Sequence, residues 1–178
     1  MDIGLILNGM KTLVVELSQW RTWRLLWFAF ACMLVTFVVA QLIKPLYVAN
    51  FGSTGGPDLA DWSKTGEFVI VCIVAPIIET FLFQLLPIYL VLRIPYFKKH
   101  YLVPVLVSAA CFAAVHHYSV LYILYAFVAG CIYSISFLVF REQVEGRAWA
   151  YIRALGLTAL AHSMFNFFGF LFLIYKSI

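Results

Sequence analysis

A few polar side chains interrupt the long apolar runs of this sequence, and their types suit proton transfer. Glu79 stands within the run from Pro76 to Pro87, which is apolar enough to lie in a bilayer. A carboxylate at the bilayer centre costs about 2.5–3.5 kcal/mol on insertion scales, so such residues usually face a bundle interior and mark a site. His116, His162 and Asn166 are further polar residues in apolar surroundings.

These residue types match the needs of peptide hydrolysis in a cavity shielded from bulk water. Such a reaction needs an activated water and a group that stabilises the tetrahedral oxyanion. We expect Glu79 to act as the general base and His116 to help hold and polarise the same water. His162 and Asn166 would donate hydrogen bonds to the oxyanion.

The spacing of the polar residues places them on single helix faces. Three pairs stand four residues apart: Thr80 and Gln84, Phe112 and His116, and His162 and Asn166. Residues four apart lie one turn from each other on the same face of a 3.6-residue helix. We therefore expect three helices to contribute one polar face each to a shared site.

Composition sets the class of protein. Of the 178 residues, 65% are hydrophobic, 18% aromatic and 11% charged, and the mean hydropathy is +0.98. This predicts an integral membrane protein that forms one membrane domain over residues 1–178. The net charge of +4 is modest and its basic residues are scattered over several loops, which indicates a lipid bilayer partner and no nucleic-acid binding.

The apolar runs predict an all-α, polytopic helical bundle with about five transmembrane helices. Residues 1–20 show apolar residues at three- or four-residue spacing, which indicates an N-terminal interfacial helix. Spans are expected at about 23–43, ended by Lys44 and Pro45, at 67–92 and at 150–175. The turn-forming stretch Gly52–Asp58 lies in the loop after the first span. The apolar stretch 101–140 is twice the length of one span, so we expect it to reverse just after His116 and His117.

The basic residues predict the orientation. With the N-terminus inside, nine of the twelve Lys and Arg residues lie on the inner side of a five-span arrangement. They are Lys11, Arg21, Arg24, Arg93, Lys98, Lys99, Arg141, Arg147 and Arg153. Because inner loops carry an excess of basic residues, we expect the N-terminus inside and the C-terminus outside.

Three ordered motifs resemble the CPBP family (CAAX protease and bacteriocin-processing, also called Abi) of intramembrane glutamic-type endopeptidases. The family's Glu-Glu-x-x-x-Arg stands here as Glu79-Thr80-Phe81-Leu82-Phe83-Gln84. Its Phe-x-x-x-His is matched by Phe112 to His116, and its His-x-x-x-Asn by His162 to Asn166. The motifs cover a protease-like core at about residues 67–175.

The resemblance implies a multi-pass protease that cuts a membrane-associated peptide or protein, with no metal or other cofactor. It implies catalytic roles for Glu79, His116, His162 and Asn166, with Thr80, Gln84 and Phe112 in support. A protein of the bacterial cytoplasmic membrane is expected on the same basis.

The first motif departs from the family pattern at two positions. The usual second Glu and the Arg lie on one helical face and can neutralise each other, whereas Thr80 and Gln84 form a neutral pair. Changing both positions avoids an unpaired buried charge. Glu79 is left as the only carboxylate of the motif.

Other chemistries remain open at this point. Glu79, His116 and His162 are a residue set that could bind a catalytic zinc ion, although no His-Glu-x-x-His motif is present. Two intramembrane histidines could also bind haem or a quinone, and a small polytopic protein could be an inactive binding or immunity partner. One geometric condition applies to the shared site: His116 lies near the end of its span, so we expect the turn after His117 to be recessed into the bundle.

Overall fold

The computed structural model describes residues 3–56, 61–144 and 147–177, and every regular element among them is helical. The elements are α1 (Ile3–Ser18), α2 (Thr22–Phe51), α3 (Lys64–Val69), η1 (Ile70–Val74), α4 (Ala75–Glu79), η2 (Thr80–Leu85), α5 (Leu86–Val91), η3 (Pro95–Lys99), α6 (Leu102–Ala114), α7 (Val120–Glu142) and α8 (Arg147–Ser177). The segments η1 and η2 are π-helical, and η3 is a 3₁₀ turn. The predicted all-α polytopic bundle is confirmed.

Four helices within the described residues are long and apolar enough to cross a membrane. They are α2, the continuous run from α3 to α5, α7 and α8. The remaining apolar helix, α6, has 13 residues, or about 20 Å at 1.5 Å per residue. That is shorter than a hydrocarbon core of about 30 Å, so the predicted third span is a short helix.

The first long helix continues past the point where the sequence was expected to end it. We predicted an end at Lys44 and Pro45, but α2 contains Pro45 and runs on to Phe51. A proline is tolerated inside a membrane helix where local adjustment satisfies the freed carbonyl. The helix stops at Gly52, whose φ of 83° suits glycine and whose N–H bonds the Val48 carbonyl.

The loop after α2 has the expected turn chemistry in its described part. Gly52, Gly55 and Gly56 all have positive φ angles. Residues 57 and 58 of the predicted turn lie outside the described residues. The next helix begins at Lys64, with the Ser63 hydroxyl accepting a hydrogen bond from the Gly66 N–H.

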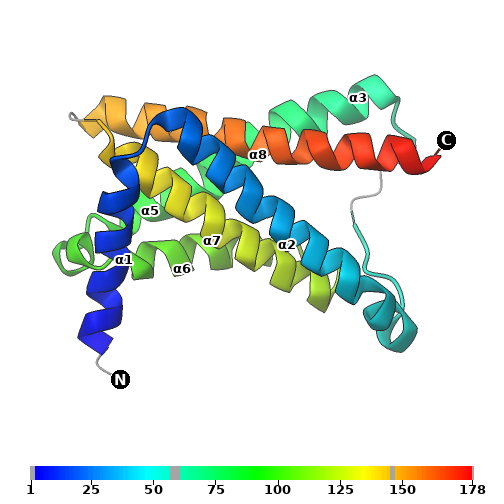
Figure 1. Cartoon of the computed structure of the whole chain (residues 1–178), viewed down its shortest axis with the longest axis horizontal. Coiled ribbons are helices and arrows are strands. Elements are labelled where there is room, and N and C mark those ends of the chain that lie inside the picture. Colours follow the sequence, from blue (N-terminus) through cyan, green and yellow to red (C-terminus); the bar gives the residue numbers. More distant parts are fainter. Residues whose placement is uncertain (1–2, 57–60, 145–146, 178) are drawn as a thin grey trace.

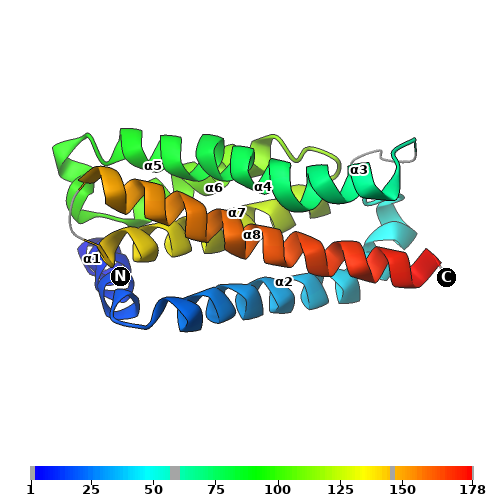
Figure 2. The same cartoon turned by 90° about the horizontal axis from the view of Figure 1, so that it is seen from above.

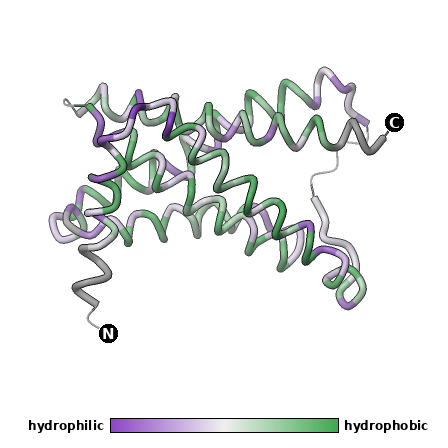
Figure 3. Tube along the Cα trace, in the orientation of Figure 1, coloured by the Kyte–Doolittle hydropathy of each residue, from purple (hydrophilic) through white to green (hydrophobic). Residues whose placement is uncertain are grey.

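The long helices form an elongated bundle around α7, and α1 lies crosswise at one end (Figures 1 and 2). The helix α7 contacts α1, α2, α6, η2 and α8. Figure 3 shows hydrophobic residues along the helices and hydrophilic stretches toward the two ends. The crosswise position of α1 fits the predicted interfacial helix.

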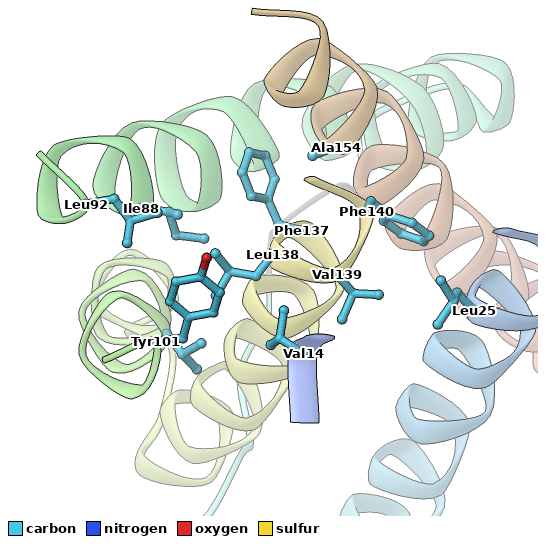
Figure 4. Packing of buried hydrophobic residues seen from close by; sticks show 11 residues of the cluster. Val14, Leu25, Ile88, Leu92, Tyr101, Phe137, Leu138, Val139, Phe140 and Ala154 are labelled. Carbon is cyan, nitrogen blue, oxygen red and sulfur yellow. The ribbon is translucent and has the colours of Figure 1, made fainter. Parts of the chain in front are cut away.

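A hydrophobic cluster holds the α1 end of the bundle together (Figure 4). It joins residues of every long element: Val14, Leu25, Ile88, Leu92, Tyr101, Val105, Phe137, Leu138, Val139, Phe140 and Ala154. In α1, Met10, Val14 and Leu17 face this cluster, while Leu13 is 42% exposed.

The reversal of the 101–140 stretch occurs where it was predicted. The helix α6 ends at Ala114 and α7 begins at Val120, with the Ser119 hydroxyl capping the Tyr122 N–H. The two helices approach closely, because a Cβ on Gly130 would lie 2.8 Å from the Ala109 Cα. Val115 and Tyr118 of the histidine turn are each 45% exposed, and its recession into the bundle stays a prediction.

Candidate active site

Two prolines shape the helix that carries Glu79. Pro76 and Pro87 each stand at the start of an α-helical segment that follows a π-helical one. Proline has no N–H to donate to the preceding turn, so each leaves a backbone carbonyl free. Short π-helical segments are frequent at functional sites, and here they flank Glu79 on both sides.

The freed carbonyls anchor neighbouring helices. In η1 the Ala75 N–H bonds the Ile70 carbonyl, so the Val71 carbonyl would pair with residue 76, which is proline. That carbonyl instead accepts a hydrogen bond from Asn166 Nδ2 at 2.9 Å. The Phe83 carbonyl, four residues before Pro87, accepts one from the Ser108 hydroxyl. Pro76 thus creates the acceptor that holds α8 against the Glu79 helix, and the Phe83 carbonyl near Pro87 is the acceptor that holds α6.

The carboxylate of Glu79 lies beside the imidazole of His162. The Oε2–Nε2 distance is 3.7 Å, and the side chains are 25% and 5% exposed, respectively. One side of Glu79 therefore remains open while His162 is almost enclosed. The structure brings these two predicted residues together directly.

Aromatic rings hold the plane of His162. Tyr133 of α7 stacks on it with ring centroids 4.4 Å apart and an angle of 26°. Phe112 of α6 meets it edge-on at 5.8 Å. Tyr133 is 1% exposed, so the ring cannot move without repacking the core. Sequence reasoning missed Tyr133, because a tyrosine in so aromatic a chain carries no distinguishing motif.

His116 also contacts Phe112. Its ring is 4.4 Å from that of Phe112 and stacks with Tyr122 at 5.9 Å. Its Nδ1 is 2.7 Å from the Phe112 carbonyl oxygen. Because a carbonyl only accepts, Nδ1 carries the hydrogen and Nε2 is left as an acceptor. In the described part of the chain, no hydrogen bond or ion pair joins His116 to Glu79, although the two histidines share the Phe112 ring.

The supporting residues of the first motif are enclosed. Thr80 and Gln84 are both 0% exposed, and the Thr80 hydroxyl and both Gln84 amide atoms have no hydrogen-bond partner among the described residues. The same holds for the Tyr133 hydroxyl, the Thr158 hydroxyl and His162 Nδ1. Buried polar atoms without partners are rare in proteins, and here they gather beside the Glu79–His162 pair.

A metal-binding geometry does not arise from the predicted zinc set. No group of three His, Cys, Asp or Glu side chains that could hold a metal ion occurs within the described residues. Glu79 and His162 are adjacent, and His116 and His162 both contact the Phe112 ring. The arrangement can instead place a small molecule between a half-open carboxylate and neutral hydrogen-bonding groups.

The comparisons with known proteins bear on the same region. A family model described as "Type II CAAX prenyl endopeptidase Rce1-like" matches residues 61–168. This range is more than half of the chain and includes all three motifs. Neither a curated protein sequence nor a solved structure matches the chain.

Proposed function

Because the chain belongs to the Rce1-like family of type II CAAX prenyl endopeptidases, we propose that it hydrolyses a peptide bond of a membrane-associated substrate with a water activated by Glu79. The observation that carries this proposal is the Glu79–His162 pair, 3.7 Å apart in the middle of the helical bundle. A carboxylate that is partly open on one side and faces an enclosed imidazole on the other can take up a proton next to a hydrogen-bond donor.

The reaction would proceed in two steps. Glu79 takes a proton from water while the water oxygen bonds to the peptide carbonyl carbon, which yields a tetrahedral oxyanion. The Glu79 carboxylic acid then returns the proton to the amine nitrogen as the carbon–nitrogen bond breaks. His116 Nε2, left as an acceptor by the Nδ1 bond to Phe112, is suited to orient the attacking water.

Two donors are suited to the oxyanion. When the hydrogen of His162 is on Nε2, that N–H points toward Glu79 and the space beside the carboxylate. Asn166 Nδ2 uses one hydrogen for the Val71 carbonyl, so its amide is held in place and its second hydrogen is free to donate. Donors fixed before the reaction contribute most to transition-state stabilisation.

We propose a reaction without a metal. The side-chain geometry supports this, since among the described residues Glu79, His116 and His162 do not form a group that could hold a metal ion. Cleavage by purified protein should be insensitive to chelators. Loss of activity with EDTA or 1,10-phenanthroline and its recovery with zinc would contradict the metal-free mechanism while leaving the protease assignment intact.

Substitution of Glu79 tests the function. Full-length protein in lipid vesicles, offered prenylated CAAX peptides and non-prenylated membrane peptides, should lose at least about 100-fold in cleavage rate on Glu79→Gln. Mass spectrometry of the products measures the rate and locates the bond that is cut.

A matched control lies on the same continuous helical run. Glu67 is 8% exposed, and its carboxylate lies 3.0 Å from Lys64 Nζ. It stands twelve residues before Glu79 in the chain. Glu67→Gln should keep normal cleavage. Equal turnover by Glu79→Gln and wild type would reject the enzymatic assignment, and an absorbance band of haem or quinone in the pure protein would then point to a binding role.

A further inference from the structure

Six enclosed polar atoms that have no hydrogen-bond partner among the described residues lie on three helical segments that meet beside the Glu79–His162 pair. They are the Thr80 hydroxyl, the two amide atoms of Gln84, the Tyr133 hydroxyl, the Thr158 hydroxyl and His162 Nδ1. We name the residues Thr80, Gln84, Tyr133 and Thr158, together with His162 Nδ1, the enclosed polar set. Their side chains belong to η2, α7 and α8.

The fold brings these side chains to one place. Thr158 and His162 are four residues apart in α8 and therefore lie on one face. Thr80 follows Glu79, whose carboxylate is 3.7 Å from His162. The segment η2 packs against both α7 and α8, and Tyr133 of α7 stacks on His162.

The degree of burial limits what could bind there. Thr80, Gln84 and Thr158 are 0% exposed, Tyr133 is 1% exposed and His162 4% exposed. A peptide or lipid cannot reach these atoms, whereas a water molecule can occupy a polar site that offers two to four hydrogen bonds. The enclosed polar set contains both donors and acceptors in sufficient number.

We propose that the enclosed polar set binds water on the closed side of the catalytic pair. A water that donates to His162 Nδ1 stabilises the form of His162 whose hydrogen is on Nε2, facing Glu79. This role for the water rests on the proposed function, in which that Nε2 hydrogen stabilises the oxyanion. The neutral pair Thr80 and Gln84 then supplies the water ligands without burying a charge.

X-ray footprinting tests the binding of water directly. Brief X-ray exposure splits water into hydroxyl radicals, which label side chains beside a bound water even when bulk solvent cannot reach them. With the full-length protein in lipid vesicles, Tyr133 should be hydroxylated, as read by mass spectrometry. Phe137, one turn along α7 and 0% exposed, is the dry reference ring. Labelling of Tyr133 no greater than that of Phe137 would overturn the proposal.

A triple variant removes the water ligands other than Tyr133 and His162. Thr80→Val, Gln84→Met and Thr158→Val together should abolish the labelling of Tyr133 and lower the melting temperature, since bound water would lose its partners. If the polar atoms were dry, their removal would instead leave the labelling unchanged and raise the melting temperature. The matched control is Thr36→Val, because the Thr36 hydroxyl bonds the Cys32 carbonyl in its own helix.

The catalytic consequence is measured separately. The triple variant should cleave membrane peptides about 3- to 30-fold more slowly, the range for the loss of one or two hydrogen bonds, while Thr36→Val cleaves normally. An unchanged rate in a variant that has lost the Tyr133 label would reject the role of the water in catalysis. If Glu79→Gln has no effect on cleavage, the proposed function fails, but the footprinting result on the water site still stands.

Discussion

The polar side chains at the α1 end of the bundle differ from those in its middle in how completely they are hydrogen-bonded. We call Thr22, Gln143 and Arg153 the α1-end network. Arg153 donates to the Phe140 carbonyl at 2.9 Å and to the Thr22 hydroxyl at 2.7 Å. Thr22 donates to Gln143 Oε1, and Gln143 Nε2 donates to the Trp20 carbonyl at 2.7 Å.

The middle of the bundle is more deeply buried and yet less completely bonded. The enclosed polar set has six atoms without partners, although an unpartnered polar atom is most costly where the surroundings are least polar. The α1-end network, which is only half-buried, joins α2, α7 and α8 through side chains and carbonyls. From this contrast we infer that the α1-end network serves the fold, and the proposed water site accounts for the polar atoms in the middle.

Replacing His162 should have the largest effect on this comparison. His162→Leu removes a donor beside Glu79 and should lower the cleavage rate about 100- to 1,000-fold, the usual loss for one oxyanion donor. The rate of peptide cleavage in vesicles measures it. His100→Leu is the matched control and should retain activity. The buried Nδ1 of His100 also has no hydrogen-bond partner among the described residues, but its ring packs at a tilt against Tyr96, with centroids 4.8 Å apart.

Replacing Arg153 should act on stability and not on chemistry. Arg153→Met removes the two hydrogen bonds of a charged group, and we expect the free energy of unfolding to fall by about 2 kcal/mol. Denaturant unfolding in detergent measures this change. Cleavage per folded molecule should stay normal; a loss as large as that of His162→Leu would mean that the two regions do not have separate roles.

Replacing Gln143 should have the smallest effect. Gln143→Met removes neutral hydrogen bonds and should lower the free energy of unfolding by about 1 kcal/mol. Because Gln143 and Arg153 share Thr22, their double variant should lose at least about 0.5 kcal/mol less than the two single losses together. Strict additivity would show that the three residues do not act as one network.

Sequence reasoning predicted the class of fold and named candidate site residues, but it did not predict which of these residues contact one another. The apolar run lengths identified the helices, and the polar residues within them identified His116, His162 and Asn166 as companions of Glu79. In the structure His162 is the direct neighbour of Glu79, and both histidines contact the Phe112 ring. The water shared by Glu79 and His116 stays a prediction. Helical spacing orders residues within one helix, whereas neighbours across helices depend on depth and rotation.

Two signals in the sequence were readable but were not used. Pro76 and Pro87 bound the stretch around Glu79, and each predicts a free carbonyl in the preceding turn. That Asn166 would take the carbonyl freed by Pro76, and Ser108 a carbonyl near Pro87, could not be read from spacing. At Pro45 the prediction that a proline ends the helix was wrong, because the apolar run continues past it and α2 runs on to Phe51.

The sequence by itself determined that this protein is a helical membrane protein whose polar residues form three ordered motifs with one carboxylate among them. Hydrophobic run length and residue type suffice for that, because they act within single segments. Only the tertiary structure decided that Glu79 meets His162, that Tyr133 stacks on that imidazole, and that Thr80 and Gln84 are enclosed without partners. These outcomes depend on the close approach of helices such as α6 and α7 at Ala109 and Gly130, which sets each helix's rotation and depth relative to its neighbours.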